Sequence, residues 1–346
     1  MNRREFLSSA TVAVSAATNL WSQTLPGRPV TAMGFSPDCF TVSRPSRKAL
    51  DYLELCARTG AGGAQLSLPT PIAPELPKQI RKRAEELGMY VEITCMMPKT
   101  DDTAEFESIV KSAKEAGAGC MRSVCLGGRR YETFNSLAEW KTFVADSRAR
   151  LARTARVVER MKMPMGIENH KDWFCEEMFP LMKEFGGEHL GLCYDFGNNM
   201  SLLDDPLEFI QTMAPFVKNA HIKDMAVEEY EDGFYLSEVV LGEGHLPLKQ
   251  MVDIMVKARP QVKFSMDFLT RSPLKIGCLT DKYWVTMPDR NGIHLARMMH
   301  YVRTHKPKSP LPWLEKMSKE EALALEASNL AKSVAYARDV LGLRKA

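Results

Sequence analysis

From residue 45 onward the chain alternates between amphipathic segments that end in glycine and short apolar runs. The first three pairs are LDYLELCARTG before AGGAQLSLP, IRKRAEELG before MYVEITCMMP, and FESIVKSAKEAG before AGCMRSVCL. Apolar residues at helical spacing predict helices, and Gly60, Gly88 and Gly117 are placed for left-handed closing turns. Apolar runs without polar alternation predict strands that are buried on both faces, as in a parallel sheet.

The same unit continues through the rest of the chain. Further helices are expected at 137–161, 175–185, 205–214 and 247–258, before the strands MPMGIEN, LGLCYDFGNN, VKNAHIKDM and QVKFSMDFL. With TAMGFS at 31–36 the strands number eight, over roughly 270 residues. This pattern predicts an α/β protein with a (β/α)8 TIM-barrel fold. A doubly wound open sheet is the alternative, but no G-x-G-x-x-G turn follows the first strand.

Two segments lie outside the expected barrel, which spans 29–305. Residues 306–346 contain the proline-rich connector KPKSPLPW and then a helix, for which Ser318 and Glu321 predict a capping box. We expect this helix to pack on the barrel or on a second subunit of a homo-oligomer. Residues 1–28 carry Arg3 and Arg4 before a mildly apolar stretch and resemble a twin-arginine export signal.

The leader predicts an exported, periplasmic protein, and a simple N-terminal arm is the alternative. The segment is too short and too polar to span a bilayer stably. The 46 basic and 43 acidic residues are mixed along the chain and give a net charge of +3. No clustered basic face indicates nucleic acid or an anionic membrane as a partner. The eight cysteines form no C-x-x-C pair, so the spacing of a zinc cluster is absent.

Polar side chains follow the last four strands at the points where these strands end. They are Glu168, Asn169 and His170 on the fifth strand, Asp195 and Asn198 on the sixth, His221, Lys223 and Asp224 on the seventh, and Asp267 on the eighth. Active sites of such barrels lie at the C-terminal ends of the strands, so we expect these groups at one rim. Asp195 alone is equally well explained as a helix cap, and His221 alone as a core residue. The hypothesis of a site rests on finding such polar residues at the ends of four consecutive strands.

Three carboxylates at one barrel mouth repel one another unless a cation compensates them. Three carboxylates with one imidazole form a hard, oxygen-rich donor set, which suits Mn2+, Mg2+ or Co2+. Glu168, at the end of an apolar run, is therefore most simply interpreted as a metal ligand.

The motifs IENH, CYDFGNN, HIKDM and LGEGHLPL resemble the xylose isomerase-like TIM-barrel superfamily, in its branch of sugar phosphate isomerases and epimerases, over about residues 31–305. The resemblance implies one divalent metal ion, Mn2+ first and Mg2+, Co2+ or Zn2+ as alternatives. Its ligands would be Glu168, Asp195, His221 and Asp267. The sequence departs from the family at Asp267, where glutamate is usual, and at Asn198, where tagatose-type epimerases have a second histidine.

Such a metal favours removal of the proton beside the carbonyl of a hydroxy-ketone, through a metal-stabilised enediolate. This predicts a sugar isomerase or epimerase that acts on a keto- or aldo-sugar. Glu168 is the expected base, with Asp267 as a second carboxylate whose role as a base is in doubt. His170 and Lys223 are expected to donate a proton or to contact an oxyanion. The expected substrate-binding residues are Glu92, Arg122, Asn169, Asn198 and His245.

Other interpretations stay open. The same metal would serve a lyase, dehydratase or hydratase acting on a keto-sugar, inosose or 3-keto-glycoside. A non-catalytic sugar-binding barrel is a further alternative, if aspartate at position 267 in place of the family's glutamate has abolished the activity. Phosphodiester hydrolysis, as in the apurinic endonuclease branch, needs several zinc ions and more histidines than the seven present. Arg129 and Arg130 offer a loop that could hold an anion, and Trp173 offers either an apolar wall for a sugar or a helix-packing residue.

Overall fold

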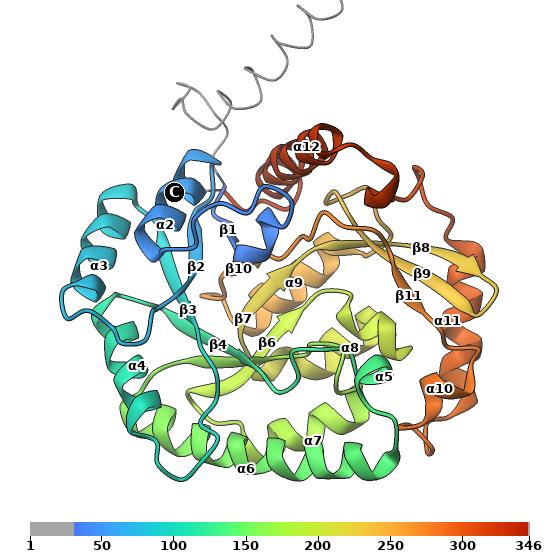
Figure 1. Cartoon of the computed structure of the whole chain (residues 1–346), viewed down its shortest axis with the longest axis horizontal. Coiled ribbons are helices and arrows are strands. Elements are labelled where there is room, and N and C mark those ends of the chain that lie inside the picture. The colour runs from blue at the N-terminus through green and yellow to red at the C-terminus, as the bar shows by residue number, and fades with distance from the viewer. Residues whose placement is uncertain (1–30, 345–346) are drawn as a thin grey trace, which may run out of the picture.

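The computed structural model describes residues 31–344, so the leader proposed for 1–28 lies outside the described residues. Eight parallel strands close into a barrel in the order β1-β10-β7-β6-β5-β4-β3-β2 (Figure 1). All eight predicted strands are present, and the (β/α)8 fold is confirmed. The strands are β1 (Gly34–Phe35), β2 (Gly63–Ser67), β3 (Tyr90–Thr94), β4 (Cys120–Val124), β5 (Met165–Glu168), β6 (Leu190–Asp195), β7 (Val217–Ile222) and β10 (Phe264–Met266).

Helices surround the barrel and alternate with its strands (Figure 1). Those of the repeat are α2 (Ala49–Arg58), α3 (Leu76–Leu87), α4 (Ala104–Glu115), α6 (Leu137–Met161), α7 (Cys175–Phe185), α8 (Pro206–Met213) and α9 (Leu248–Ala258). Gly60, Gly88 and Gly117 have positive φ angles of 88°, 58° and 73°, as their positions after helices predict. Short helical turns are η1 (Pro37–Phe40), α5 (Arg130–Thr133), η2 (Asn198–Leu202), η3 (Ala214–Phe216), α10 (Asp281–Trp284) and η4 (Leu314–Lys316).

A small antiparallel sheet, which the sequence analysis did not predict, follows β7. It consists of the hairpin β8 (Asp224–Tyr230) and β9 (Gly233–Val239), to which β11 (Leu274–Ile276) pairs. The Asp224 carboxylate fixes the loop after β9, because it accepts hydrogen bonds from the N–H groups of Gly242, Gly244 and Leu246 at 2.9–3.1 Å. A Cβ at Gly244 would lie 2.2 Å from Asp224 Oδ1, so this close approach requires glycine. Asp224 therefore organises a loop and does not face the barrel mouth.

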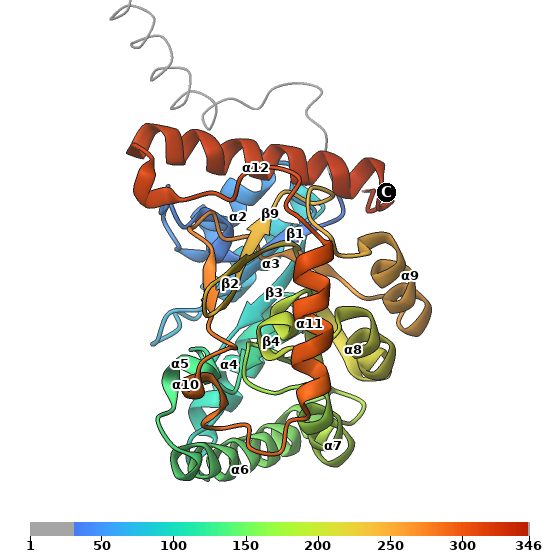
Figure 2. The ribbon, with the colours of Figure 1, turned by 90° about the vertical axis from the view of Figure 1, so that its right-hand side faces the viewer.

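Two long helices complete the chain, α11 (Gly292–Thr304) and α12 (Lys319–Asp339). The predicted capping box of α12 is present, with Ser318 and Glu321 bonded reciprocally. The helix packs on its own barrel beside β1 (Figures 1 and 2), where Leu330, Val334 and Ala337 are buried. Within residues 31–344, no helix has the length and the apolar character needed to cross a membrane.

Candidate active site

Four side chains from neighbouring strands converge inside the barrel. Glu168 ends β5, Asp195 ends β6, His221 lies on β7, and Asp267 directly follows β10. His221 Nδ1 lies 3.3 Å from Glu168 Oε2, 3.6 Å from Asp195 Oδ2 and 3.7 Å from Asp267 Oδ2. All four side chains are buried, and Asp267, the most accessible, is 6% exposed. The structure thus brings the four predicted metal ligands together, and we call them the ligand cluster.

The imidazole of His221 has the orientation of a metal ligand. Its Nε2 lies 2.9 Å from the amide oxygen of Gln65, whose Nε2 donates to Glu92 Oε2 at 2.8 Å. An amide oxygen only accepts, so Nε2 carries a proton, and Nδ1 is the ring atom left to offer a lone pair to a metal ion. Burial opposes a charged imidazole, but the carboxylates of Glu168 and Asp267 outweigh it and raise the pKa of His221 to about 9, so a metal ion would displace a proton from Nδ1. This buried Nδ1 has no hydrogen-bond partner among the described residues. One nitrogen and three carboxylates around one point fit a divalent ion.

Cys193 is a candidate ligand that the sequence analysis missed. Its thiol lies within 4.8 Å of ligand atoms of Glu168 and His221, and the residue is fully buried. Cys193 stands two residues before Asp195 on β6, and side chains two apart on a strand share a face. The same alternation in LGLCYD could have identified it. A thiol beside the carboxylates would make the site softer than the predicted set of oxygens and one nitrogen.

Cations next to the ligand cluster compensate part of its negative charge. Arg122 Nε donates to Glu168 Oε2 at 2.6 Å, and Lys223 Nζ lies 2.8 Å from Asp195 Oδ1 and 3.6 Å from Asp267 Oδ2. Burial opposes ionisation of Glu168, but Arg122 and His221 outweigh it and lower the pKa of Glu168 to about 2. At Asp195 burial prevails over Lys223 and raises the pKa to about 6. Two carboxylates on adjacent strands thus have different proton affinities.

His170 lies at the mouth with a defined tautomer. Its Nδ1 is 3.0 Å from the carbonyl oxygen of Leu126. A carbonyl accepts only, so Nδ1 carries the proton and Nε2 keeps a lone pair. Burial lowers the pKa of His170 to about 4. The imidazole is therefore neutral and keeps a lone pair on Nε2, and the predicted role of His170 as proton donor or oxyanion contact stays a prediction.

Three of the predicted substrate-binding residues lie at different places around the ligand cluster. Asn169 joins the tips of β5 and β6, because it donates to the Asp195 carbonyl at 3.0 Å and accepts from the Asp195 N–H at 2.7 Å. Asn198 lies above Glu168, with Nδ2 3.5 Å from Oε1. Glu92 lies beneath His221 in the barrel interior and also accepts from Ser265 at 3.2 Å. It supports the site from below.

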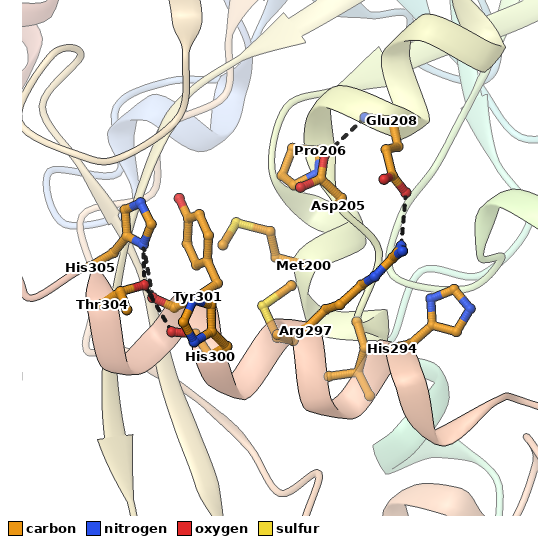
Figure 3. Close-up of a pocket in the computed structure, with 12 residues that line it drawn as sticks. Met200, Asp205, Pro206, Glu208, His294, Arg297, His300, Tyr301, Thr304 and His305 are labelled. Carbon is orange, nitrogen blue, oxygen red and sulfur yellow. Dashed lines mark hydrogen bonds and ion pairs between the residues drawn. The ribbon is translucent and has the colours of Figure 1, made fainter.

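His245 is not part of this group. Its ring packs against His305 with the centroids 5.3 Å apart, and its carbonyl accepts from Tyr301 Oη at 3.3 Å. Tyr301 and His305 line a separate cavity of about 280 Å³ between α8 and α11, shown in Figure 3. None of the predicted ligands lines that cavity. The structure therefore places His245 away from the barrel mouth.

The cavity at the barrel mouth has a volume of about 330 Å³. It is lined by Asp38, Arg122, Gly127, Gly128, Arg129, Glu132, His170, Lys171, Lys223, Asp267, Leu269 and Arg271. Asp38, Lys171 and Arg271 were not predicted from the sequence as residues of the site. Of the two loop arginines only Arg129 reaches this cavity, since the Arg130 guanidinium lies 3.6 Å from the ring centre of Trp140. Trp173 packs against the same Trp140 and is a helix-packing residue.

Residues 51–272 match the protein family described as xylose isomerase-like TIM barrel, which covers more than half of the chain. The chain belongs to this family. The uncharacterized protein YihM of Escherichia coli K12 is 27% identical over 176 residues, which are 51% of this chain and half the length of YihM. The 3-oxo-isoapionate decarboxylase of Pectobacterium atrosepticum is 26% identical over 199 residues, 56% of this chain and 68% of the relative.

Several solved structures share the fold of this family member. A D-psicose 3-epimerase studied with D-fructose has a TM-score of 0.57 at 14% identity, covering 90% of this chain and 99% of its own. The IolI protein with bound zinc has a TM-score of 0.53 at 13% identity, with 88% and 98% covered. A Mycobacterium smegmatis barrel of this type in complex with magnesium has a TM-score of 0.51 at 11% identity, with 80% and 98% covered.

Proposed function

We propose that this protein is a divalent-metal-dependent sugar isomerase or epimerase that acts on a hydroxy-ketone or its aldose isomer. The observation that carries the proposal is the ligand cluster, in which an unpartnered, buried His221 Nδ1 faces carboxylate oxygens from three other strands at 3.3–3.7 Å. Membership of the xylose isomerase-like family supports the same chemistry. We assign Glu168, Asp195, His221 and Asp267 as ligands, with Mn2+ as the first candidate ion.

The two oxygens of Glu168 have different surroundings, and this suits a base. Oε2 faces His221 and Arg122, whereas Oε1 accepts a hydrogen bond of 3.5 Å from the Asn198 amide. A bound divalent ion would act as a Lewis acid on adjacent substrate oxygens and acidify the C–H bond beside the carbonyl. We assign Glu168 Oε1 as the group that takes that proton. His170 Nε2 offers a second proton acceptor on the cavity wall, and Lys223 Nζ donates hydrogen bonds at the cavity floor.

A lyase is the second candidate, and the state of the carboxylates favours it. Asp267, at the position of the family's second carboxylate, accepts from Ser36 Oγ at 2.5 Å and lies 3.6 Å from Lys223 Nζ. Both oxygens of Asp267 are thus engaged, so this carboxylate is poorly placed to return a proton on the opposite face. Cleavage of a bond beside the carbonyl needs an electron sink and one proton donor, without a second base. One relative is itself named as a decarboxylase, which is a lyase.

The test is product analysis in heavy water. Metal-loaded protein is incubated with ketoses and keto-sugar acids, and NMR and mass spectrometry follow each compound. An isomerase or epimerase incorporates deuterium at the carbon beside the carbonyl and conserves the carbon skeleton, whereas a lyase releases a smaller or dehydrated product. Both reactions should stop when a chelator removes the metal.

A variant pair checks the role of Glu168. Glu168→Gln should lower the exchange rate by at least about 100-fold, because it removes both the proposed base and one of the proposed metal ligands. Glu320→Gln, on the exposed surface of α12, is the matched control and should leave the rate unchanged. Exchange that persists in Glu168→Gln, or that continues after chelation, contradicts the mechanism.

We also propose that the protein is exported in a folded state through a twin-arginine pathway. The support is the pair Arg3 and Arg4 ahead of an uncharged stretch that ends at Arg28. Replacing both arginines of the pair by lysine should leave the uncleaved protein in the cytoplasm. Unchanged processing of that variant in cell fractions would contradict export by this route.

A further inference from the structure

The cavity at the barrel mouth has an unusual balance of charges. Its lining includes five cationic side chains and three carboxylates. Four of the cations have carboxylate partners: Arg122 with Glu168, Arg129 with Glu132, Lys223 with Asp195, and Arg271 with Glu238. The fifth, Lys171, forms no ion pair within residues 31–344. The wall of the cavity therefore carries one cation that forms no contact ion pair, although the charges of Asp195 and Glu238 act on it from a longer distance.

Lys171 is only 5% exposed, and its Nζ donates to the amide oxygen of Asn198, a neutral acceptor. A buried ammonium group without an ion-pair partner is costly, and burial together with the charge of Lys223 lowers the pKa of Lys171 to about 8. A lysine that serves only to hold an amide could be replaced by an uncharged donor at lower cost. The position of Lys171 is therefore best explained by an anion that enters the cavity.

The backbone holds Lys171 in a conformation that side chains with a Cβ rarely adopt. Its φ angle is +60°, in the left-handed region. The Lys171 carbonyl accepts from the Arg130 N–H at 3.1 Å, and the next carboxylate, Asp172, accepts from the N–H groups of Leu126 and Trp173. Hydrogen bonds from the loop after β4 thus fix a strained residue at the cavity wall, which is typical of functional positions.

We propose that the substrate carries an anionic group, a carboxylate or a phosphate, and that this group binds Lys171 with Arg129 and Arg271 at the rim. This inference rests on the proposed function and specifies its substrate class as an anionic sugar derivative. Arg129 and Arg271 are partly exposed, at 29% and 24% of their side chains, and each has N–H groups beyond those used for its carboxylate partner. Lys223 and Asp267 line the same cavity, so its volume of about 330 Å³ holds the anion and the reacting carbons together.

The test is binding of three open-chain probes that lack a carbonyl group, so that no turnover interferes. They are D-gluconate, D-glucitol and D-glucitol 6-phosphate, titrated calorimetrically into Mn2+-loaded protein. The wild type should bind at least one of the two anions roughly tenfold more tightly than neutral glucitol, as expected for a charge-assisted hydrogen bond. The preferred anion distinguishes a carboxylate substrate from a phosphate substrate.

Variants of Lys171 separate this subsite from direct binding of the anion at the metal. Lys171→Met should abolish the preference for the anion, whereas Lys171→Arg should retain most of it. Lys162→Met is the matched control, because Lys162 is also a lysine with left-handed backbone (φ 51°) but lies exposed at the end of α6. Lys162→Met should keep the wild-type preference. If Lys171→Met does not fold, Lys171→Gln, which preserves a donor for Asn198, takes its place.

Two outcomes would overturn the inference. One is equal binding of both anions and glucitol to the wild type, and the other is an anion preference that survives loss of the Lys171 charge. A Lys171-dependent preference without any metal-dependent turnover would leave the anion site standing and remove the proposed function. If neutral ketoses are turned over at the same rate with and without the Lys171 charge, the proposed function stands and the anion site is removed.

Discussion

At the scale of single residues, the site depends on groups that never reach the cavity. Gln65 on β2 and Glu92 on β3 form a chain of hydrogen bonds beneath His221, with distances of 2.9 and 2.8 Å. This chain fixes the proton on Nε2 and orients Nδ1 toward Glu168, Asp195 and Asp267. Outer-shell partners of this kind orient a metal-binding imidazole and raise its basicity.

Replacing Gln65 by leucine should therefore weaken metal binding by roughly ten- to a hundredfold. The variant keeps all four ligands, but the imidazole loses the acceptor that selects its tautomer. Mn2+ affinity measured by calorimetry checks the prediction, together with the melting temperature of the metal-free protein. Gln79→Leu, on the exposed surface of α3, controls for a glutamine-to-leucine change. Wild-type affinity in the Gln65 variant would show that the amide has no positioning role.

The sequence predicted the ligand cluster but not its supports. Glu168, Asp195, His221 and Asp267 stand out because each follows an apolar run at a strand end, where barrel geometry places active sites. Gln65 gives no such signal, since its partner His221 lies 156 residues away and only closure of the barrel brings the two together. Lys171 stands in the motif IENHKDW, but only the folded structure shows that it has no contact ion pair within the described residues.

At the scale of elements, the loop after β5 contributes His170 and Lys171 to the cavity and also contains a buried carboxylate that affects stability. Asp172 in this loop is fully buried and accepts hydrogen bonds from Trp173 N at 3.0 Å and Leu126 N at 3.3 Å. These bonds join the loop after β5 to the segment after β4. Burial outweighs both hydrogen bonds and raises the pKa of Asp172 from 3.8 to about 7.

This shift predicts a pH-dependent contribution to stability. Between about pH 4 and pH 7 the folded protein keeps a proton on Asp172 that the unfolded chain releases, so the contribution falls as pH rises through this window. Relative to Asp172→Asn, the wild type should lose roughly 2 kcal/mol of unfolding free energy between pH 5 and pH 8. Chemical denaturation at several pH values measures this difference. Asp253→Asn, exposed on α9, should run parallel to the wild type, and parallel curves for Asp172→Asn would contradict the assignment.

Elements with a strong local pattern were predicted closely, and α6 and α7 begin and end at the predicted residues. The hairpin of β8 and β9 was missed for a physical reason. Only Lys223 separates the end of β7 from the start of β8, so HIKDM reads as one strand although the chain leaves the barrel there. The helix α11 was also missed, because residues 268–305 lack the glycine-terminated repeat of the earlier units.

At the scale of the whole molecule, the C-terminal helix is part of the barrel. The Glu326 carboxylate on α12 accepts from the N–H groups of Val42 at 2.7 Å and Ser43 at 3.1 Å, in the loop that follows β1. Thr31 Oγ1 donates to the Leu343 carbonyl at 2.7 Å, next to the start of β1. Hydrogen bonds thus join the first part of the described chain, around β1, to its last part, α12 and the residues that follow it.

Glu326→Ala should lower the melting temperature by roughly 3 to 5 °C, because it removes a buried carboxylate that accepts from two backbone N–H groups. Scanning calorimetry measures the effect, and Glu320→Ala on the exposed face of α12 should change the melting temperature by less than about 2 °C. Equal melting temperatures for the two variants would show that α12 is an independent appendage. The sequence predicted this helix and its cap, but did not decide between its own barrel and a second subunit.

Metal content is the most direct test of a divalent-metal site at the ligand cluster. Purified protein is loaded with Mn2+, Mg2+, Co2+ or Zn2+, freed of excess ion by gel filtration, and analysed for bound metal beside Glu168→Gln, Asp195→Ala and the exposed control Glu320→Gln. We predict about one divalent ion per chain in the wild type and the control, and strong depletion in the two ligand variants. Failure of the wild type to retain any of the four ions, or equal metal in all the variants, would contradict a metal site at the ligand cluster.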